Sequence, residues 1–251
     1  MGKMATFVLV PGLWLGSWVW DAVAGRLRAD GHTVHALTMP GIAERAAEAK
    51  PDTDLRTEIA DIVAYLREHG LREVVLVGHS GANMPVTGVI DEVPELITRV
   101  VYVDSGPMPS GLGVIDFLPP QAQDAQRRQV AEQGEGWLLP PPPFDAEQDP
   151  VNLAGISEAE LERVRGLASP QPFRTTTDAL DRPGDPMPVP ASAITCTFTP
   201  EQVAQLAETG NPIFALMTKL ELHPLPTGHW PMLSRPDDLA VLLGQVGQVR
   251  H

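Results

Sequence analysis

The chain has 251 residues, 43% of them hydrophobic and 20% charged, a composition typical of a soluble globular domain. The formal net charge of −14 excludes nucleic acid and anionic membrane surfaces as partners, because both would repel it. The apolar stretch at residues 7–10 ends at Pro11, so we expect neither a signal peptide nor a membrane span. A single cysteine, Cys196, forbids an internal disulfide, and we expect a cytoplasmic protein.

Short apolar runs alternate with helical patterns in the first hundred residues. Three of the runs are apolar on both faces, which is typical of buried strands in a parallel sheet: residues 7–10, 74–77 and 100–103. A helix is predicted over residues 18–29, before a strand at residues 33–37. Apolar spacings of three and four predict another helix that begins near Asp54 and ends at Gly70. This alternation predicts an α/β fold, a mostly parallel twisted sheet with helices on both faces.

The middle third of the sequence has a different character. Fifteen of the 26 prolines lie in residues 107–190, a stretch without lysine. The alternation disappears there, and only short helical pieces are predicted, at residues 122–133 and 157–165. Prolines stiffen a chain, so we expect an ordered insertion rather than a flexible linker. The predicted domains are a core of residues 1–106 and 191–251 and a cap, or lid, of residues 107–190.

The regular pattern resumes after residue 190. A strand is predicted over residues 193–198 and a helix over residues 200–207, followed by an apolar stretch around residues 216–222. Ser234 and Asp237 are spaced as in a capping box and predict the start of a last helix. The sheet is therefore interrupted once, by the proline-rich insertion.

A serine follows the apolar run at residues 74–77. The next residues, 78–82, read GHSGA and lead into a segment compatible with a helix. At such a sharp strand-to-helix turn, small neighbours let the chains approach, and the serine hydroxyl projects over the end of the sheet. The amide of Gly81, at the start of the helix, can donate to an oxyanion. Ser80 is therefore the candidate nucleophile; the alternative is a serine that only caps the helix.

A serine nucleophile needs a base within hydrogen-bond reach, usually a histidine. Of the seven histidines, His229 lies in a loop after the last predicted strand and before the last predicted helix, as expected for the base. His79 is next to the serine, but its side chain should point away from the apex of the turn, so we interpret it as structural. The alternative for His229 is a surface histidine in a proline-rich loop.

Together these motifs resemble the α/β-hydrolase superfamily, and within it the small esterase and hydroxynitrile lyase-like group. The resemblance covers nearly the whole chain through four segments: residues 8–20, 78–80, 101–104 and 228–229. The first segment looks like the oxyanion loop of that group, which implies that Leu13 supplies a second oxyanion amide beside Gly81. Pro11 is a mild departure, because relatives often have histidine there.

The acid departs from the pattern of the resembling family. An aspartate normally ends the strand predicted at residues 194–198, whereas this chain has Thr199 there and Glu201 two residues later. Thr199 cannot carry the charge that orients and stabilises an imidazolium. Asp104 ends the preceding strand, at the edge of the sheet where sites gather, and other branches take their acid from that strand end. We predict Asp104 as the acid, with Glu201, or a Ser–His dyad, as alternatives.

The resulting prediction is a serine hydrolase that cleaves a small, largely apolar ester or lactone through an acyl-enzyme. The cap should cover the site, and three aromatic residues are candidates for the pocket lining, or equally for the core of the cap: Trp14, Trp137 and Phe144. No dinucleotide motif, P-loop, zinc motif or cysteine pair occurs in the sequence, so we expect no cofactor and no metal. The expected partner is a small-molecule substrate, and the protein is expected to be a monomer or a homodimer.

Two other classes of function stay open on this scaffold. A lyase or a cofactor-independent oxygenase would use His229 mainly as a base. Hydroxynitrile lyases of the resembling group carry a lysine shortly after the histidine. In this chain Trp230 follows the histidine, and no lysine occurs after Lys219. This difference counts against cyanohydrin cleavage but not against an oxygenase. A non-catalytic ligand-binding protein is the other class, although binding alone would need neither Ser80 nor His229.

Overall fold

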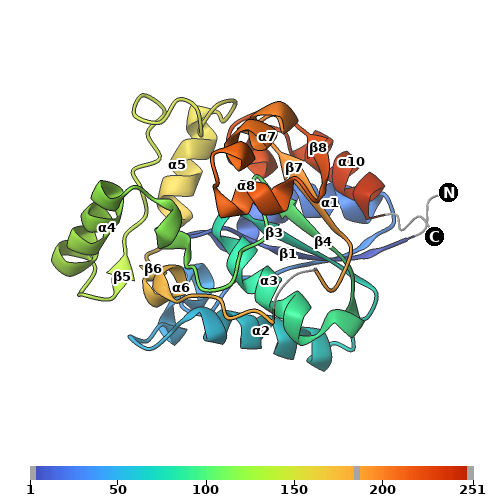
Figure 1. The fold of residues 1–251 in the computed structure, drawn as a ribbon, viewed down its shortest axis with the longest axis horizontal. Coiled ribbons are helices and arrows are strands. Elements are labelled where there is room, and N and C mark those ends of the chain that lie inside the picture. Colours follow the sequence, from blue (N-terminus) through green and yellow to red (C-terminus); the bar gives the residue numbers. More distant parts are fainter. Residues whose placement is uncertain (1–3, 184–186, 248–251) are drawn as a thin grey trace.

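The computed structural model describes residues 4–183 and 187–247 (Figure 1). Within these residues, one sheet has the strand order β2-β1-β3-β4-β7-β8, and all its neighbouring strands pair in parallel. The strands of this sheet are β1 (Thr6–Val10), β2 (Thr33–Ala36), β3 (Val74–His79), β4 (Ile97–Val103), β7 (Ala191–Thr195) and β8 (Glu221–Pro224). The α/β fold predicted from the sequence is confirmed.

Helices cover both faces of the sheet. Helices α1 (Asp21–Ala29) and α10 (Pro236–Val246) pack on one face, and α2 (Leu55–Glu68) and α3 (Asn83–Glu92) pack on the other (Figure 1). Helix α2 begins where the sequence predicts, because the side chain of Asp54 accepts the backbone N–H of Thr57 at 2.9 Å. Two apolar cores result, one on each side of the sheet.

Residues 107–190, which we call the cap segment, lie between β4 and β7. Figure 1 shows most of their elements together at one end of the molecule. Those elements are η5 (Val114–Phe117), α4 (Pro120–Gln133), β5 (Leu138–Leu139), α5 (Glu158–Leu167), β6 (Gln171–Pro172) and α6 (Arg174–Thr177). Strands β5 and β6 pair antiparallel, apart from the main sheet. Because β4 and β7 are neighbours in the main sheet, the cap segment leaves and re-enters the fold at adjacent strands.

The chain after β7 differs from the sequence prediction in two places. The strand predicted to reach residue 198 ends at Thr195, and residues 196–198 form a bend. Helix α10 has no capping box, because the Ser234 hydroxyl donates to the Trp230 carbonyl at 3.3 Å instead of capping the helix. The remaining short elements are η1 (Ser17–Trp20), η2 (Ala43–Glu48), η3 (Ser80–Ala82), η4 (Pro94–Leu96), α7 (Pro200–Glu208), α8 (Pro212–Met217) and α9 (Pro231–Ser234).

Candidate active site

Ser80 lies at a sharp turn between β3 and α3. Its φ of 51° is in the left-handed region, which a residue with a side chain rarely adopts without support. Two glycines make room for this turn. A Cβ at Gly12 would lie 3.0 Å from the Cβ of Ser80, and a Cβ at Gly78 would lie 2.8 Å from Val86. The turn therefore needs small residues at both places; the GHSGA motif indicates this for Gly78, whereas Gly12 lies outside the motif.

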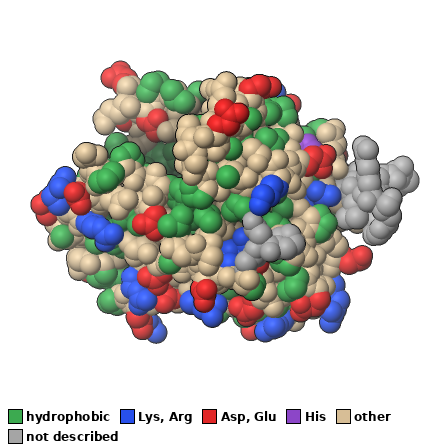
Figure 2. All heavy atoms as spheres, viewed as in Figure 1, with side chains coloured by type: hydrophobic (Ala, Val, Ile, Leu, Met, Phe, Trp, Pro, Cys, Tyr) green, Lys and Arg blue, Asp and Glu red, His purple; other side chains and the backbone are tan. Residues whose placement is uncertain are grey.

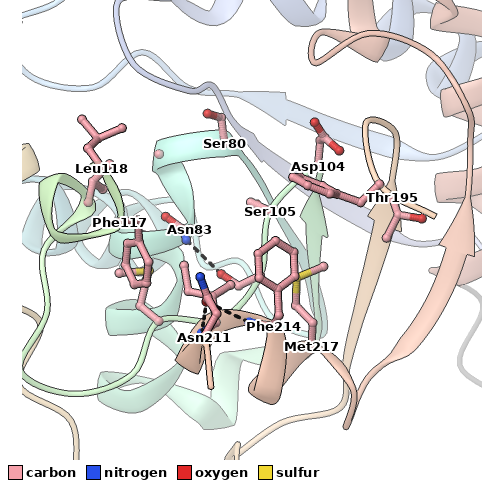
Figure 3. Close-up of a pocket in the computed structure, with 16 residues that line it drawn as sticks. Ser80, Asn83, Asp104, Ser105, Phe117, Leu118, Thr195, Asn211, Phe214 and Met217 are labelled. Carbon is pink, nitrogen blue, oxygen red and sulfur yellow. Dashed lines mark hydrogen bonds between the residues drawn. The ribbon is translucent and has the colours of Figure 1, made fainter. Parts of the chain in front are cut away.

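The loop between β8 and α9 brings His229 to this serine. Its Nε2 atom lies 2.8 Å from the hydroxyl oxygen of Ser80. Its Nδ1 atom lies 2.6 Å from Oδ2 of Asp104. The three side chains, distant in sequence, thus form one hydrogen-bonded chain at the carboxyl ends of the sheet strands, and Figure 3 shows Ser80 and Asp104 along one edge of the adjoining pocket.

Asp104 is held as a carboxylate by donors from the segment after β7. Its Oδ1 atom accepts the backbone N–H groups of Cys196 and Thr197, both at 2.9 Å, and its Oδ2 atom accepts the Thr197 hydroxyl at 2.8 Å. Burial of Asp104 opposes ionisation. The hydrogen bond and charge of His229, together with these amides, outweigh that effect and lower the pKa of Asp104 below its ordinary value. The carboxylate can therefore fix the His229 tautomer and stabilise an imidazolium.

His79 points away from the apex of the turn. Its fully buried ring donates from Nε2 to the backbone carbonyl of His229 at 2.7 Å. Burial lowers the pKa of His79 to about 3, so the ring stays neutral at ordinary pH. His79 therefore fixes the backbone of the loop that carries His229.

The loop after β1, residues 11–16, packs directly on the start of η3. A Cβ at Gly81 would lie 2.7 Å from the Cγ of Leu13, so the Leu13 side chain packs directly against Gly81. We call residues 11–16 the β1 loop. The sequence prediction pairs Leu13 with Gly81, and the structure brings these two residues together.

A cavity of about 290 Å³ opens beside Ser80 and extends toward α8 (Figure 3). Its lining is mostly apolar and comes from the turn, the strand ends, η5 and α8: Ser80, Gly81, Asn83, Asp104, Ser105, Gly106, Met108, Val114, Phe117, Leu118, Thr195, Phe198, Asn211, Ile213, Phe214 and Met217. In the space-filling view, hydrophobic side chains gather around a hollow in the region of α5 and α8 (Figure 2). The cavity can therefore hold a small, largely apolar molecule against the Ser80 hydroxyl.

The three aromatic residues predicted to line the pocket lie elsewhere, which corrects that prediction. Phe144 is buried and packs edge-on against Trp230, with ring centroids 5.6 Å apart. The indole of Trp14 donates to the Leu139 carbonyl in the cap segment, and Trp137 is half-buried beside β5. These side chains contribute to the packing of the cap segment, and the cavity beside Ser80 takes its aromatic lining from other residues.

Glu201, the alternative acid, is exposed in the first turn of α7. Hydrogen bonds from its own backbone amide and from Thr199 lower its pKa, as is usual at a helix start. The structure therefore places Asp104, and not Glu201, against His229.

Sequence reasoning missed several residues of the site. Thr197 carried no signal, because a threonine after a strand is common and its contact with Asp104 depends on where β7 ends. The aromatic residues that line the cavity, such as Phe117 and Phe214, occur in irregular segments and have the same pattern as core residues. In residues 4–183 and 187–247, no cluster of three or more metal-ligating side chains occurs.

Comparison with known proteins identifies the family of the chain. The model of the alpha/beta hydrolase family matches residues 7–242, nearly the whole chain. The chain belongs to the alpha/beta hydrolase family. None of the helices of this alpha/beta hydrolase, in the part of the chain that the structure describes, has the length and apolar character needed to cross a bilayer.

Among curated relatives, the alpha/beta hydrolase is 32% identical to the carbendazim hydrolyzing esterase of Nocardioides sp. (strain SG-4G) over 181 residues, 71% of this chain and 66% of that one. It is 26% identical to Methylesterase 17 of Arabidopsis thaliana over 148 residues, 57% of this chain and 53% of that one. The matches thus span less than two thirds of these relatives. Among solved structures, an extracellular alpha/beta-hydrolase from a Paenibacillus species superposes with a TM-score of 0.81 at 23% identity, over 98% of this chain and 100% of that one.

Proposed function

We propose that this alpha/beta hydrolase cleaves a small, largely apolar carboxylic ester or lactone through an acyl-enzyme. The observation that carries the proposal is the continuous hydrogen-bonded chain from Ser80 through His229 to Asp104, with distances of 2.8 and 2.6 Å. Relatives named as esterases support the same class of reaction. A purely ligand-binding protein would not need a nucleophile, a base and an acid in this order.

In the proposed reaction, the Ser80 oxygen attacks the ester carbonyl while Nε2 of His229 takes the hydroxyl proton. The Asp104 carboxylate stabilises the imidazolium that forms. His229 then gives this proton to the leaving alkoxide, and the acyl group stays on Ser80. A water molecule, deprotonated by His229, attacks the acyl-enzyme and releases the acid, which restores the Ser80 hydroxyl.

We assign the oxyanion of the tetrahedral intermediate to the backbone amides of Leu13 and Gly81. The packing supports this role, because Gly81 directly follows Ser80 and the side chain of Leu13 packs against Gly81 from a different segment. Amides fixed in advance stabilise the developing negative charge without reorganisation of the site.

The cavity beside Ser80 supports a substrate whose acyl or alcohol part is small and apolar. Val114, Phe117 and Leu118 of the cap segment line it, which supports the role of residues 107–190 as a cap. Methionine and phenylalanine side chains from α8 line the opposite side, namely Met217 and Phe214. We propose that this lining selects the substrate and excludes bulk water.

A panel of variants tests the proposal with a short-chain chromogenic ester and a fluorophosphonate that labels activated serines. We expect Ser80→Ala and His229→Ala to abolish turnover, and Asp104→Asn to lower kcat by about 10³- to 10⁴-fold because the tautomer is lost. Glu201→Gln is the matched control and should turn over like the unmodified protein. If the unmodified protein neither hydrolyses esters nor reacts with the fluorophosphonate, the chain is not a serine hydrolase.

The proposal includes a cytoplasmic enzyme whose partner is its small-molecule substrate, acting as a monomer or homodimer without cofactor or metal. Cell fractionation and size-exclusion chromatography test the location and the oligomeric state. If the enzyme needs no metal, its turnover should not change after exhaustive treatment with a chelator.

A further inference from the structure

Trp14 has an unusual backbone for a residue with a large side chain. It directly follows Leu13, and its φ of 66° lies in the left-handed region. Non-glycine residues persist there only where their surroundings hold them. The position of the Leu13 amide therefore depends on the groups that hold Trp14.

The cap segment holds Trp14 through three hydrogen bonds. The backbone N–H of Trp14 donates to Oε1 of Gln171 at 3.1 Å, and its indole N–H donates to the Leu139 carbonyl at 3.2 Å. The Trp14 carbonyl accepts the backbone N–H of Ser169 at 3.0 Å. Only the bond from Gln171 uses a side chain of the cap segment, so a substitution there can remove it and leave the cap backbone in place.

The amide of Gln171 is fully buried, and its orientation is fixed by its neighbours. Its Nε2 atom donates to the Thr175 hydroxyl at 2.8 Å and to Oε1 of Glu58 at 3.2 Å. The Thr175 hydroxyl donates its own proton to the Pro172 carbonyl at 2.8 Å, so toward Gln171 it can only accept. Nε2 must therefore face Thr175 and Glu58, which leaves Oε1 facing the N–H of Trp14.

Glu58, in the first turn of α2, is a buried carboxyl group that the proposed reaction does not use. The pKa of Glu58 is raised to about 8, chiefly by burial; the hydrogen bond from Gln171 opposes the shift, and the charges of Asp61 and Asp54 add to it. Glu58 shares a small cavity with Leu13, Gly81 and Gln171, and its neighbours there from other elements carry no charge. The carboxyl group is thus mainly protonated at pH 7, and it lies close to the two residues whose amides are proposed to bind the oxyanion.

We propose that Gln171 is a positioning residue for the oxyanion amide of Leu13, and that Glu58 is the neutral group that completes its anchorage. The proposal rests on the function proposed above. The cap segment reaches through Gln171 into the core and holds the β1 loop in its left-handed conformation. When Glu58 ionises, its negative charge lies close to Leu13 and Gly81, whose amides are proposed to stabilise the oxyanion, and catalysis weakens.

Gln171→Leu and Glu58→Gln test this assignment, with Gln148→Leu as the matched control. Gln148 is an exposed cap residue whose amide donates to Asp145, outside the site. For each protein, kcat and KM for a chromogenic ester are measured from pH 6 to pH 10, together with the rate of Ser80 labelling by a fluorophosphonate and the thermal midpoint.

We expect Gln171→Leu to lower kcat and the labelling rate by about 10- to 100-fold with little change in KM, because transition-state stabilisation is lost rather than binding. The unmodified protein should lose kcat as the pH rises through about 8, and this alkaline loss should be absent from Glu58→Gln. Gln148→Leu should match the unmodified protein throughout.

A Gln171→Leu variant that folds and keeps kcat within twofold overturns the assignment, as does an alkaline loss that persists in Glu58→Gln. If Gln171→Leu fails to fold, the pH profile of Glu58→Gln decides alone. Failure of the proposed function has a different signature, because the unmodified protein itself would then neither hydrolyse the ester nor react with the fluorophosphonate.

Discussion

Two hydroxyl groups on the cavity wall have no hydrogen-bond partner in the described part of the chain. They belong to Thr195, at the end of β7, and Ser105, which follows Asp104. Thr195 is only 2% exposed. A buried hydroxyl without a partner costs free energy, since the folded state loses the hydrogen bonds that water provided.

We therefore expect Thr195→Val, which keeps the shape of the side chain, to leave the free energy of unfolding unchanged or to raise it by about 1 kcal/mol. Thr87→Val is the matched control, because the buried Thr87 hydroxyl donates to the Asn83 carbonyl at 2.6 Å and lies 2.9 Å from the Tyr102 hydroxyl. That variant should lose about 1 to 3 kcal/mol. Urea unfolding measures both values, and a Thr195→Val protein as unstable as Thr87→Val would contradict this view.

At the scale of elements, the returning end of the cap segment is fastened to α3 by one buried ion pair. The guanidinium of Arg182 donates to both carboxylate oxygens of Asp91, at 2.7 and 3.0 Å. The side chains are 2% and 10% exposed, so solvent screens the pair little. Arg182 also donates to the Met108 carbonyl at 3.3 Å, which joins the two ends of the cap segment.

Arg182→Met should lower the free energy of unfolding by about 3 to 5 kcal/mol, because Asp91 then stays buried without its cation. Arg182→Met with Asp91→Leu should recover part of that loss. Arg174→Met provides the comparison, since the Arg174 side chain, which pairs with Asp178 and Asp54, is 49% exposed and solvent screens its charge, and it should cost less than about 1 kcal/mol. Equal losses for Arg182→Met and Arg174→Met in urea unfolding would refute the anchoring role.

The sequence predicts most elements because buried parallel strands leave continuous apolar runs, and α2 carries a true capping signal at Asp54. The sequence-based prediction is wrong where contacts between distant residues determine the end of an element or the position of a side chain. Strand β7 ends early because Cys196 and Thr197 turn their amides to Asp104, which also explains how the acid can lie on the preceding strand. Trp14, Trp137 and Phe144 do not line the cavity, and their packing fits the alternative role in the core of the cap. A sequence pattern cannot tell a side chain that lines a cavity from one that fills a core.

At the scale of the whole molecule, the cap segment contacts both loops that carry the proposed chemistry. It holds the β1 loop at Trp14, and on the opposite side the Asn152 carbonyl accepts the backbone N–H of His229 at 2.7 Å. Gly228 makes the second contact possible, because a Cβ there would lie 2.3 Å from the Asn152 carbonyl oxygen.

Gly228→Ala should lower kcat/KM for the chromogenic ester by about 100-fold, because His229 would shift by a fraction of an ångström or more relative to Ser80. Gly166→Ala, in α5, introduces the same methyl group where no atom lies within 4 Å, and activity should not change. Kinetics of the two variants at equal concentrations of folded protein measure the difference. Unimpaired Gly228→Ala would show that this loop tolerates displacement.

The double attachment of the cap segment also limits how such enzymes can be recombined. A chimera that takes residues 107–190 from a relative would receive a new pocket wall, but it would keep the two attachments only if the new insertion places a backbone carbonyl against His229 and a glutamine amide against Trp14. Exchange of substrate range by grafting should therefore succeed only when the β1 loop and residues 227–230 are transplanted together with the insertion.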